Sequence, residues 1–230
     1  MRYPNIRAGR FAARPNRFVA HVELENELVV CHVKNTGRCR ELLVPGARVW
    51  LTESENLARK TKYDLVAVEK QTDRGCLLIN MDAQAPNQVF QEWAQGGGFH
   101  TGLTLLRPET TFGNSRFDFY WELSHRRGFV EVKGVTLEEH GVARFPDAPT
   151  LRGVKHLEEL VRARQAGFEA TVCFLVQMEG MERVEPNDIT HPEFGAALRR
   201  AAGAGVEVFA LDCVVKPNSL LVNGRIPVRL

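Results

Sequence analysis

The chain has 230 residues, a net charge of +2, a hydrophobic fraction of 44% and a charged fraction of 25%. These values are typical of a globular protein with one large domain or two small ones, and no apolar run is long enough to cross a bilayer. The first residues carry arginines but no apolar signal core, so we expect a cytoplasmic protein without a membrane partner.

Arginine dominates the start of the chain, which contains no acidic residue before Glu23. The basic residues are Arg2, Arg7, Arg10, Arg14 and Arg17, and the aromatic residues Tyr3, Phe11 and Phe18 are interleaved with them. Because arginine attracts phosphate and an aromatic face can stack on a base, Arg14, Arg17 and Phe18 are candidate nucleic-acid-binding residues. A solubilising edge with its rings turned into the core is an equally good interpretation of this stretch.

The first third of the chain is predicted to form about five short strands. The apolar or alternating runs cover residues 17–24, 27–33, 47–53, 63–71 and 75–81. Five short strands separated by turns indicate a small barrel or a sandwich. The OB-like barrel is the five-stranded option, and that fold binds single-stranded nucleic acid on one face. Residues 1–84 hold 14 Lys and Arg against 10 Asp and Glu, whereas residues 85–230 hold 16 against 18, so the basic charge lies in the first part.

The pattern changes at residues 82–87, which predicts a first domain over 1–84 and a second over 85–230. The second domain is predicted to contain helices over 88–95, 149–167 and 192–205, and strands over 103–112, 115–123, 128–137, 170–178 and 206–215. This order implies a mixed sheet with covering helices, so the expected fold class is α/β, or α+β over the whole chain.

Two neighbouring strands of the second domain carry a pattern suited to metal-dependent chemistry. The link between them is turn-like, so strands 115–123 and 128–137 are predicted to pair as an antiparallel hairpin. Side chains alternate along a strand, which can place Asp118, Glu131 and Lys133 on one side, subject to register. Two carboxylates suit Mg²⁺ or Mn²⁺, and a lysine beside them can stabilise charge on a phosphate or help deprotonate water.

Other interpretations of these residues stay open on the sequence alone. Glu131 and Lys133 by themselves are more typical of a surface ion pair worth at most about 1 kcal/mol. Asp118, and Glu109 one strand earlier, favour the active-site interpretation. On the helix over 149–167, Arg152 and His156 are four residues apart and share one face, so they are candidate phosphate ligands. A solvated helix face is the better interpretation when the helix is considered alone.

Several segments together resemble the sugar fermentation stimulation protein A family. They are "RFVAHV", "NTGR", "VPG", "SRFDF", "VEVKGVTL" and "FPDAPTLRGVKHL", which follow one another over most of the chain. The pair "RFDF" and "VEVKGVTL" also resembles the signature of the PD-(D/E)XK nuclease superfamily. The residue before Asp118 is Phe117 rather than proline, which leaves the carboxylate in place.

The resemblance implies an N-terminal five-stranded OB-like β-barrel followed by a PD-(D/E)XK nuclease-like domain with a mixed sheet flanked by helices. It also implies nucleic-acid binding and a link to the regulation of sugar (maltose) metabolism in bacteria. The superfamily's metal-binding acids carry over to Asp118 and Glu131, its catalytic lysine to Lys133, and an additional upstream acid to Glu109.

Two functions compete on these grounds. The first is a Mg²⁺- or Mn²⁺-dependent nuclease that binds and cleaves DNA or RNA, with Glu109, Asp118, Glu131 and Lys133 as catalytic residues. The alternative is a non-cleaving, non-specific DNA-binding regulator of sugar metabolism genes that retains a nuclease-like fold. A sugar-handling protein ranks last, because the sequence shows no sugar-site signature. The strand preference of the nucleic acid and the oligomeric state, a homodimer included, stay open.

Overall fold

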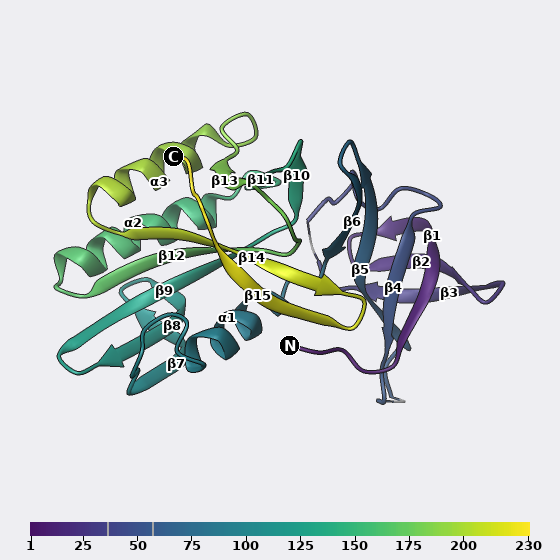
Figure 1. Ribbon diagram of the computed structural model, residues 1–230, viewed down its shortest axis with the longest axis horizontal. Coiled ribbons are helices and arrows are strands. Elements are labelled where there is room, and N and C mark those ends of the chain that lie inside the picture. Colours follow the sequence, from purple (N-terminus) through teal and green to yellow (C-terminus); the bar gives the residue numbers. More distant parts are fainter. Residues whose placement is uncertain (36, 57) are drawn as a thin grey trace.

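The computed structural model describes residues 1–35, 37–56 and 58–230, which form a β-barrel beside a larger unit built on a mixed sheet (Figure 1). The barrel strands are β1 (Ile6–Asn16), β2 (Val19–Leu24), β3 (Glu27–Val33), β4 (Arg48–Glu53) and β5 (Tyr63–Thr72), followed by β6 (Gly75–Asn80). They follow the order β3-β2-β1-β4-β5-β6. A parallel pairing of β3 with β5 closes the first five strands into a ring, so the expected five-stranded OB-like barrel is confirmed.

The membership of the ring differs from the sequence prediction. Strand β1, which lies before the first predicted strand, is a barrel strand that pairs with both β2 and β4. Only Phe11 is buried on this strand, so its apolar pattern is too weak to reveal it. Strand β6, which was predicted as the fifth barrel strand, lies outside the ring as the hairpin partner of β5.

The second unit is a mixed sheet of six strands with helices on both faces. Its elements are α1 (Ala85–Gln95), β7 (Leu105–Phe112), β8 (Ser115–Leu123), β9 (Arg126–Val135), β10 (Leu137–Glu139), β11 (Val142–Phe145), α2 (Leu151–Gln165), β12 (Glu169–Val176), β13 (Arg183–Pro186), α3 (Pro192–Gly203), β14 (Glu207–Lys216) and β15 (Ser219–Ile226). The sheet order is β15-β14-β12-β9-β8-β7, with β9, β12 and β14 parallel in the centre. Strands β10, β11 and β13 form a small second sheet, and the sequence did not predict these three strands or β15.

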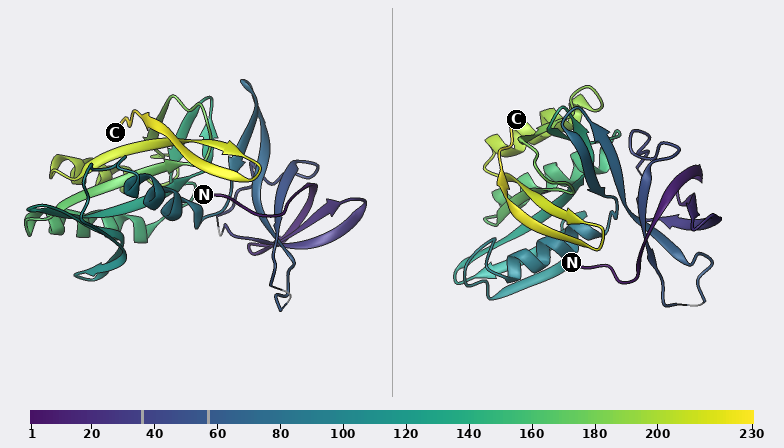
Figure 2. Two further views of the ribbon diagram at one scale, coloured as in Figure 1. Left: turned by 60° about the horizontal axis from the view of Figure 1, so that its bottom comes forward. Right: turned by 45° about the vertical axis from the view of Figure 1, so that its right-hand side comes forward.

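Two apolar cores hold the sheet between its helices. On one face, Leu157 and Leu160 of α2 and Phe194 of α3 pack with sheet residues. On the other face, Phe90 of α1 packs with Trp121 of β8. The helices α2 and α3 therefore cover one face and α1 covers the other, as Figures 1 and 2 show. No helix among the described residues is long and apolar enough to span a membrane.

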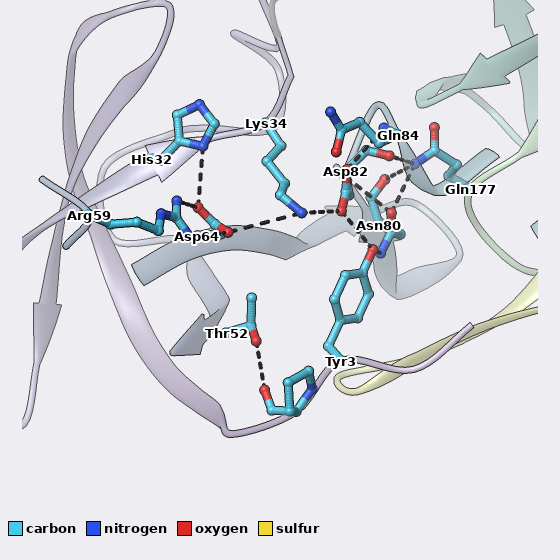
Figure 3. Close-up of polar contacts among 11 residues, drawn as sticks. Tyr3, His32, Lys34, Thr52, Arg59, Asp64, Asn80, Asp82, Gln84 and Gln177 are labelled. Atoms are coloured by element: carbon cyan, nitrogen blue, oxygen red, sulfur yellow. Dashed lines mark hydrogen bonds and ion pairs between the residues drawn. The ribbon is translucent and has the colours of Figure 1, made fainter. Parts of the chain in front are cut away.

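The two units share a polar junction. The side-chain amide of Gln177, which follows β12, donates to the backbone carbonyls of Asn80 and Asp82 at 3.1 and 3.0 Å (Figure 3). The first residues of the chain start beside α1 and the β14–β15 hairpin and run across to the barrel (Figures 1 and 2). There the backbone N–H of Tyr3 donates to the carbonyl of Asn218 at 2.8 Å. Contacts from both ends of the barrel segment therefore tie it to the sheet unit.

Candidate active site

The hairpin of β8 and β9 brings two carboxylates together. The strands are antiparallel, with Phe119 opposite Val130 and Tyr120 opposite Phe129, which confirms the predicted hairpin. Continuing this register places Asp118 across from Glu131, on the same face of the sheet. The Oδ2 atom of Asp118 accepts a hydrogen bond from the backbone N–H of Val132 at 2.7 Å, beyond the last paired residues. Asp118 therefore sits where β8 and β9 begin to separate.

Glu131 is buried and uses its two side-chain oxygens differently. The Oε1 atom lies 2.5 Å from Nζ of Lys133 and accepts a second hydrogen bond from Nδ1 of His156. The Oε2 atom is buried and has no hydrogen-bond partner among the described residues. A buried carboxylate oxygen without a partner is costly, so this atom is poised to bind a further positively charged group. The donor set of hard oxygens fits a divalent cation such as Mg²⁺ or Mn²⁺.

The two carboxylates have opposite pKa shifts. Burial, and then repulsion from Glu131, raises the pKa of Asp118 to about 6, although hydrogen bonds and Lys133 partly oppose this. Burial also favours a higher pKa for Glu131, but the positive charge of Lys133 and the contact with His156 outweigh it and lower that pKa. Glu131 is therefore held as the anion, whereas the charge on Asp118 is disfavoured unless a cation balances it.

Helix α2 supplies His156 from its buried face. The Nε atom of Arg152 donates to Nε2 of His156 at 3.3 Å, so Nε2 is the acceptor and Nδ1 carries the proton donated to Glu131. The solvated-face interpretation is thus wrong for His156, which is buried, although Arg152 remains exposed. His156 therefore contacts the carboxylate of Glu131 from the buried side of α2.

The first turn of α2 exposes an apolar residue and buries a glycine. Leu151 is 81% exposed, while Gly153 is buried. A Cβ at position 153 would lie 3.1 Å from the ring of Phe194, so this glycine lets α3 approach α2 closely. His156 lies on the same buried side of α2, where it contacts Glu131.

Glu109 is not brought together with the other acids. Its backbone has φ of +54°, which interrupts the alternation of β7. Its carboxylate lies 3.0 Å from the guanidinium of Arg116, and both side chains are more than half exposed. No contact of Glu109 with Asp118 or Glu131 occurs within the described ranges, so the geometry argues against a shared metal site.

The candidate nucleic-acid ligands of the barrel lie in two environments. The guanidinium of Arg14 donates to the carbonyls of Arg17, Asn35, Gly37 and Arg38 at 2.7 to 3.0 Å. The structure thus assigns Arg14 to holding this loop, which argues against the phosphate-binding role expected for it. In contrast, Arg17 and Phe18 are exposed at the turn between β1 and β2.

Two residues near the carboxylates were not predicted from the sequence. Asn87, at the start of α1, donates from Nδ2 to Oδ1 of Asp118 at 2.8 Å. Gly134 follows Lys133, and a Cβ there would lie 2.6 Å from Oε1 of Gln177 and 2.7 Å from Pro86. Glycine therefore allows α1 and the end of β12 to approach the strand that carries Lys133. Neither residue belongs to a pattern with a spacing that indicates a site.

Comparisons with known proteins match this architecture over the whole chain. A family model described as the SfsA N-terminal OB domain matches residues 13–79, and one described as the sugar fermentation stimulation protein RE domain matches residues 84–219. A sugar fermentation stimulation protein homolog of Desulfitobacterium hafniense is 54% identical over 230 residues, covering 100% of this chain and 99% of the relative. A homolog of Ruminiclostridium cellulolyticum is 49% identical, with both chains fully covered.

A solved structure is similar along the full chain as well. It is described as Pyrococcus furiosus SfsA in complex with Ca²⁺. The TM-score is 0.89 at 26% sequence identity, and the match covers 100% of this chain and 98% of that one.

Proposed function

The chain belongs to the sugar fermentation stimulation protein family, and on that premise we propose that it cleaves DNA or RNA with the help of Mg²⁺ or Mn²⁺. The observation that carries the proposal is the Oε2 atom of Glu131, which is buried without a hydrogen-bond partner among the described residues. The raised pKa of Asp118 supports the same proposal, because a cation would relieve the repulsion that raises it.

Asp118 and Glu131 would hold the cation. Within the described ranges no group of three or more His, Cys, Asp and Glu side chains converges on one point, so water and substrate phosphate would complete the coordination, as is usual for Mg²⁺. The Ca²⁺ complex of the Pyrococcus furiosus relative supports a hard cation in this fold. When bound, such a cation activates a water molecule and stabilises the leaving oxygen of a phosphodiester.

The neighbouring side chains have distinct roles in this proposal. Lys133 places a positive charge beside the carboxylates, where it stabilises the negative charge that develops on the phosphate. His156 donates to Oε1 of Glu131 and so fixes the orientation of the carboxylate whose Oε2 atom would bind the cation. Arg152 is exposed next to His156, which leaves it available to contact a phosphate of the substrate.

The test is cleavage of labelled DNA and RNA by the purified protein with Mg²⁺, with Mn²⁺ and with a chelator. We expect metal-dependent cleavage by the wild type and none by Glu131→Gln. The matched control is Glu122→Gln on β8, whose carboxylate accepts from the hydroxyl of Tyr120. Equal residual cleavage in the wild type and Glu131→Gln would indicate a contaminating nuclease and overturn the proposal.

A second function is favoured by the exposure of Arg17 and Phe18. A non-cleaving DNA-binding regulator needs a basic, aromatic surface but no metal. It predicts that DNA binding weakens with salt and with Arg17→Gln, while Glu131→Gln binds as the wild type does. Metal-dependent cleavage that requires Glu131 would exclude this alternative.

Replacing His156 by alanine is expected to weaken Mn²⁺ binding about 10- to 100-fold, the usual cost of losing a residue that orients a metal ligand. Isothermal titration calorimetry measures the affinity directly. His140→Ala is the matched control, because that ring is 88% exposed and contacts Asp73 on the surface. Unchanged Mn²⁺ affinity in the folded His156→Ala protein would contradict the orienting role.

A further inference from the structure

A polar pocket opens at one end of the barrel, outside the carboxylate site. It is a cavity of ≈ 490 Å³ that is lined by Phe18, His32, Lys34, Arg59, Asp64 and Gln84, among others. These residues come from the β1–β2 turn, strand β3 and the residue after it, the β4–β5 loop, strand β5 and the segment before α1. The pocket therefore collects side chains from one end of the barrel and from the junction with the sheet unit.

Buried acids hold the cations of this pocket in place (Figure 3). The guanidinium of Arg59 contacts both oxygens of Asp64, at 3.0 and 2.5 Å, and His32 lies 3.2 Å from the same carboxylate. The ammonium of Lys34 lies between two acids, 3.0 Å from Asp82 and 4.0 Å from Asp64. Since the acids are buried while Lys34 and Arg59 are 24% and 29% exposed, a ligand entering the pocket meets positioned cations.

An apolar surface leads into the pocket. Phe18 is 51% exposed at its rim, and Leu28 and Val30 on strand β3 are 65% and 48% exposed. Leu28, Val30, His32 and Lys34 alternate with inward residues, so they lie along one side of β3. Exposed rings and apolar side chains beside fixed cations are the combination that binds bases and phosphates of single strands.

The pocket also lies close to the carboxylate site. Gln84 lines the pocket and Asn87 donates to Asp118, and these two residues are three positions apart at the start of α1. Three residues of an α-helix advance about 5 Å along its axis. The pocket and Asp118 therefore both adjoin the start of α1.

We propose that this pocket binds an unpaired nucleotide of a single-stranded segment, with the base on the ring of Phe18 and a phosphate at Lys34 and Arg59. The inference rests on the proposed nucleic-acid function and narrows it to substrates with a single-stranded region next to the cleaved bond. A paired base cannot expose its face to Phe18, because its neighbours in the duplex cover both faces.

The test is the affinity of a labelled single strand of about 16 nucleotides, the upper site size of one OB fold, measured by fluorescence anisotropy in a chelator. The matching duplex is measured in parallel. We expect Phe18→Ala to weaken single-strand binding about tenfold and Phe18→Trp to preserve it, because one stacked base contributes this much. Ile189→Ala, at a position 95% exposed on the other unit, is expected to bind as the wild type does.

Each other outcome has a defined meaning. Equal single-strand affinity of Phe18→Ala and the wild type, or an equal loss for single strand and duplex, overturns the inference. A changed sedimentation coefficient of Phe18→Ala without a change in binding shows a protein interface and also overturns it. Cleavage that depends on Glu131 without any effect of Phe18 leaves the proposed function intact. Phe18-dependent binding without metal-dependent cleavage supports the pocket and contradicts the nuclease.

Discussion

Replacing Lys133 by methionine is expected to lower the rate of metal-dependent cleavage about 100- to 1000-fold while leaving Mn²⁺ affinity within a few-fold of the wild type. The ammonium of Lys133 lies 2.5 Å from Oε1 of Glu131, and the side chain is 14% exposed. Its positive charge is therefore held beside the proposed metal ligands and is only partly screened by solvent. Methionine retains the length of the side chain and removes only the charge. Glu131 keeps its hydrogen bond from His156, so the ligand stays oriented.

The measurement pairs single-turnover cleavage rates with calorimetric Mn²⁺ titrations on the same protein. Lys155→Met is the control, because that ammonium is exposed on α2 and donates to the carbonyl of Asn114 at 2.8 Å. If Lys133→Met loses metal affinity and rate together, Lys133 supports the metal site and does not act on the phosphate. An unchanged rate would remove Lys133 from the mechanism.

The hairpin that carries the site could be predicted because its pattern is local. Strand alternation and a turn between residues 123 and 128 are enough to place Asp118 and Glu131 on one face, and the observed register agrees. The closed barrel also followed from short strands and turn residues. In both cases the apolar pattern of neighbouring residues determines which side chains meet.

The remaining features depend on contacts between distant segments. His156 lies on the buried face of α2, where it contacts Glu131 of β9, and Gly153 of the same helix lets Phe194 of α3 approach. Helical periodicity alone predicts neither of these contacts. Arg14 is occupied by carbonyls of a loop some 20 residues further along the chain. Glu109 adopts a left-handed backbone that glutamate seldom adopts, so no residue preference indicates it. The environments of these residues could therefore be identified only in the folded structure.

In the absence of metal, replacing Asp118 by asparagine is expected to stabilise the protein by roughly 1 to 3 kcal/mol at pH 8, because a pKa raised by about two units corresponds to that free energy. Burial and Glu131 raise the pKa of Asp118 from 3.8 to about 6, so its charged form disfavours folding. Asparagine can still accept from the N–H of Val132 and donate to a rotated amide of Asn87, so both contacts remain available. Urea unfolding in a chelator measures the difference.

The dependence on pH and metal separates this prediction from a packing effect. Well below pH 3.8 Asp118 is protonated in both the folded and the unfolded states, so the advantage of asparagine disappears. The advantage develops between pH 3.8, where the unfolded chain loses its proton, and about pH 6, where the folded wild type does, and it stays constant above that. Saturating Mn²⁺ should make the wild type the more stable protein, because metal that binds only the folded wild type stabilises it. Asp188→Asn, an exposed partner of Arg199, should show neither effect. The prediction is contradicted if Asp118→Asn is less stable than the wild type in the chelator. The charged carboxylate of Asp118 would then stabilise the metal-free fold instead of destabilising it.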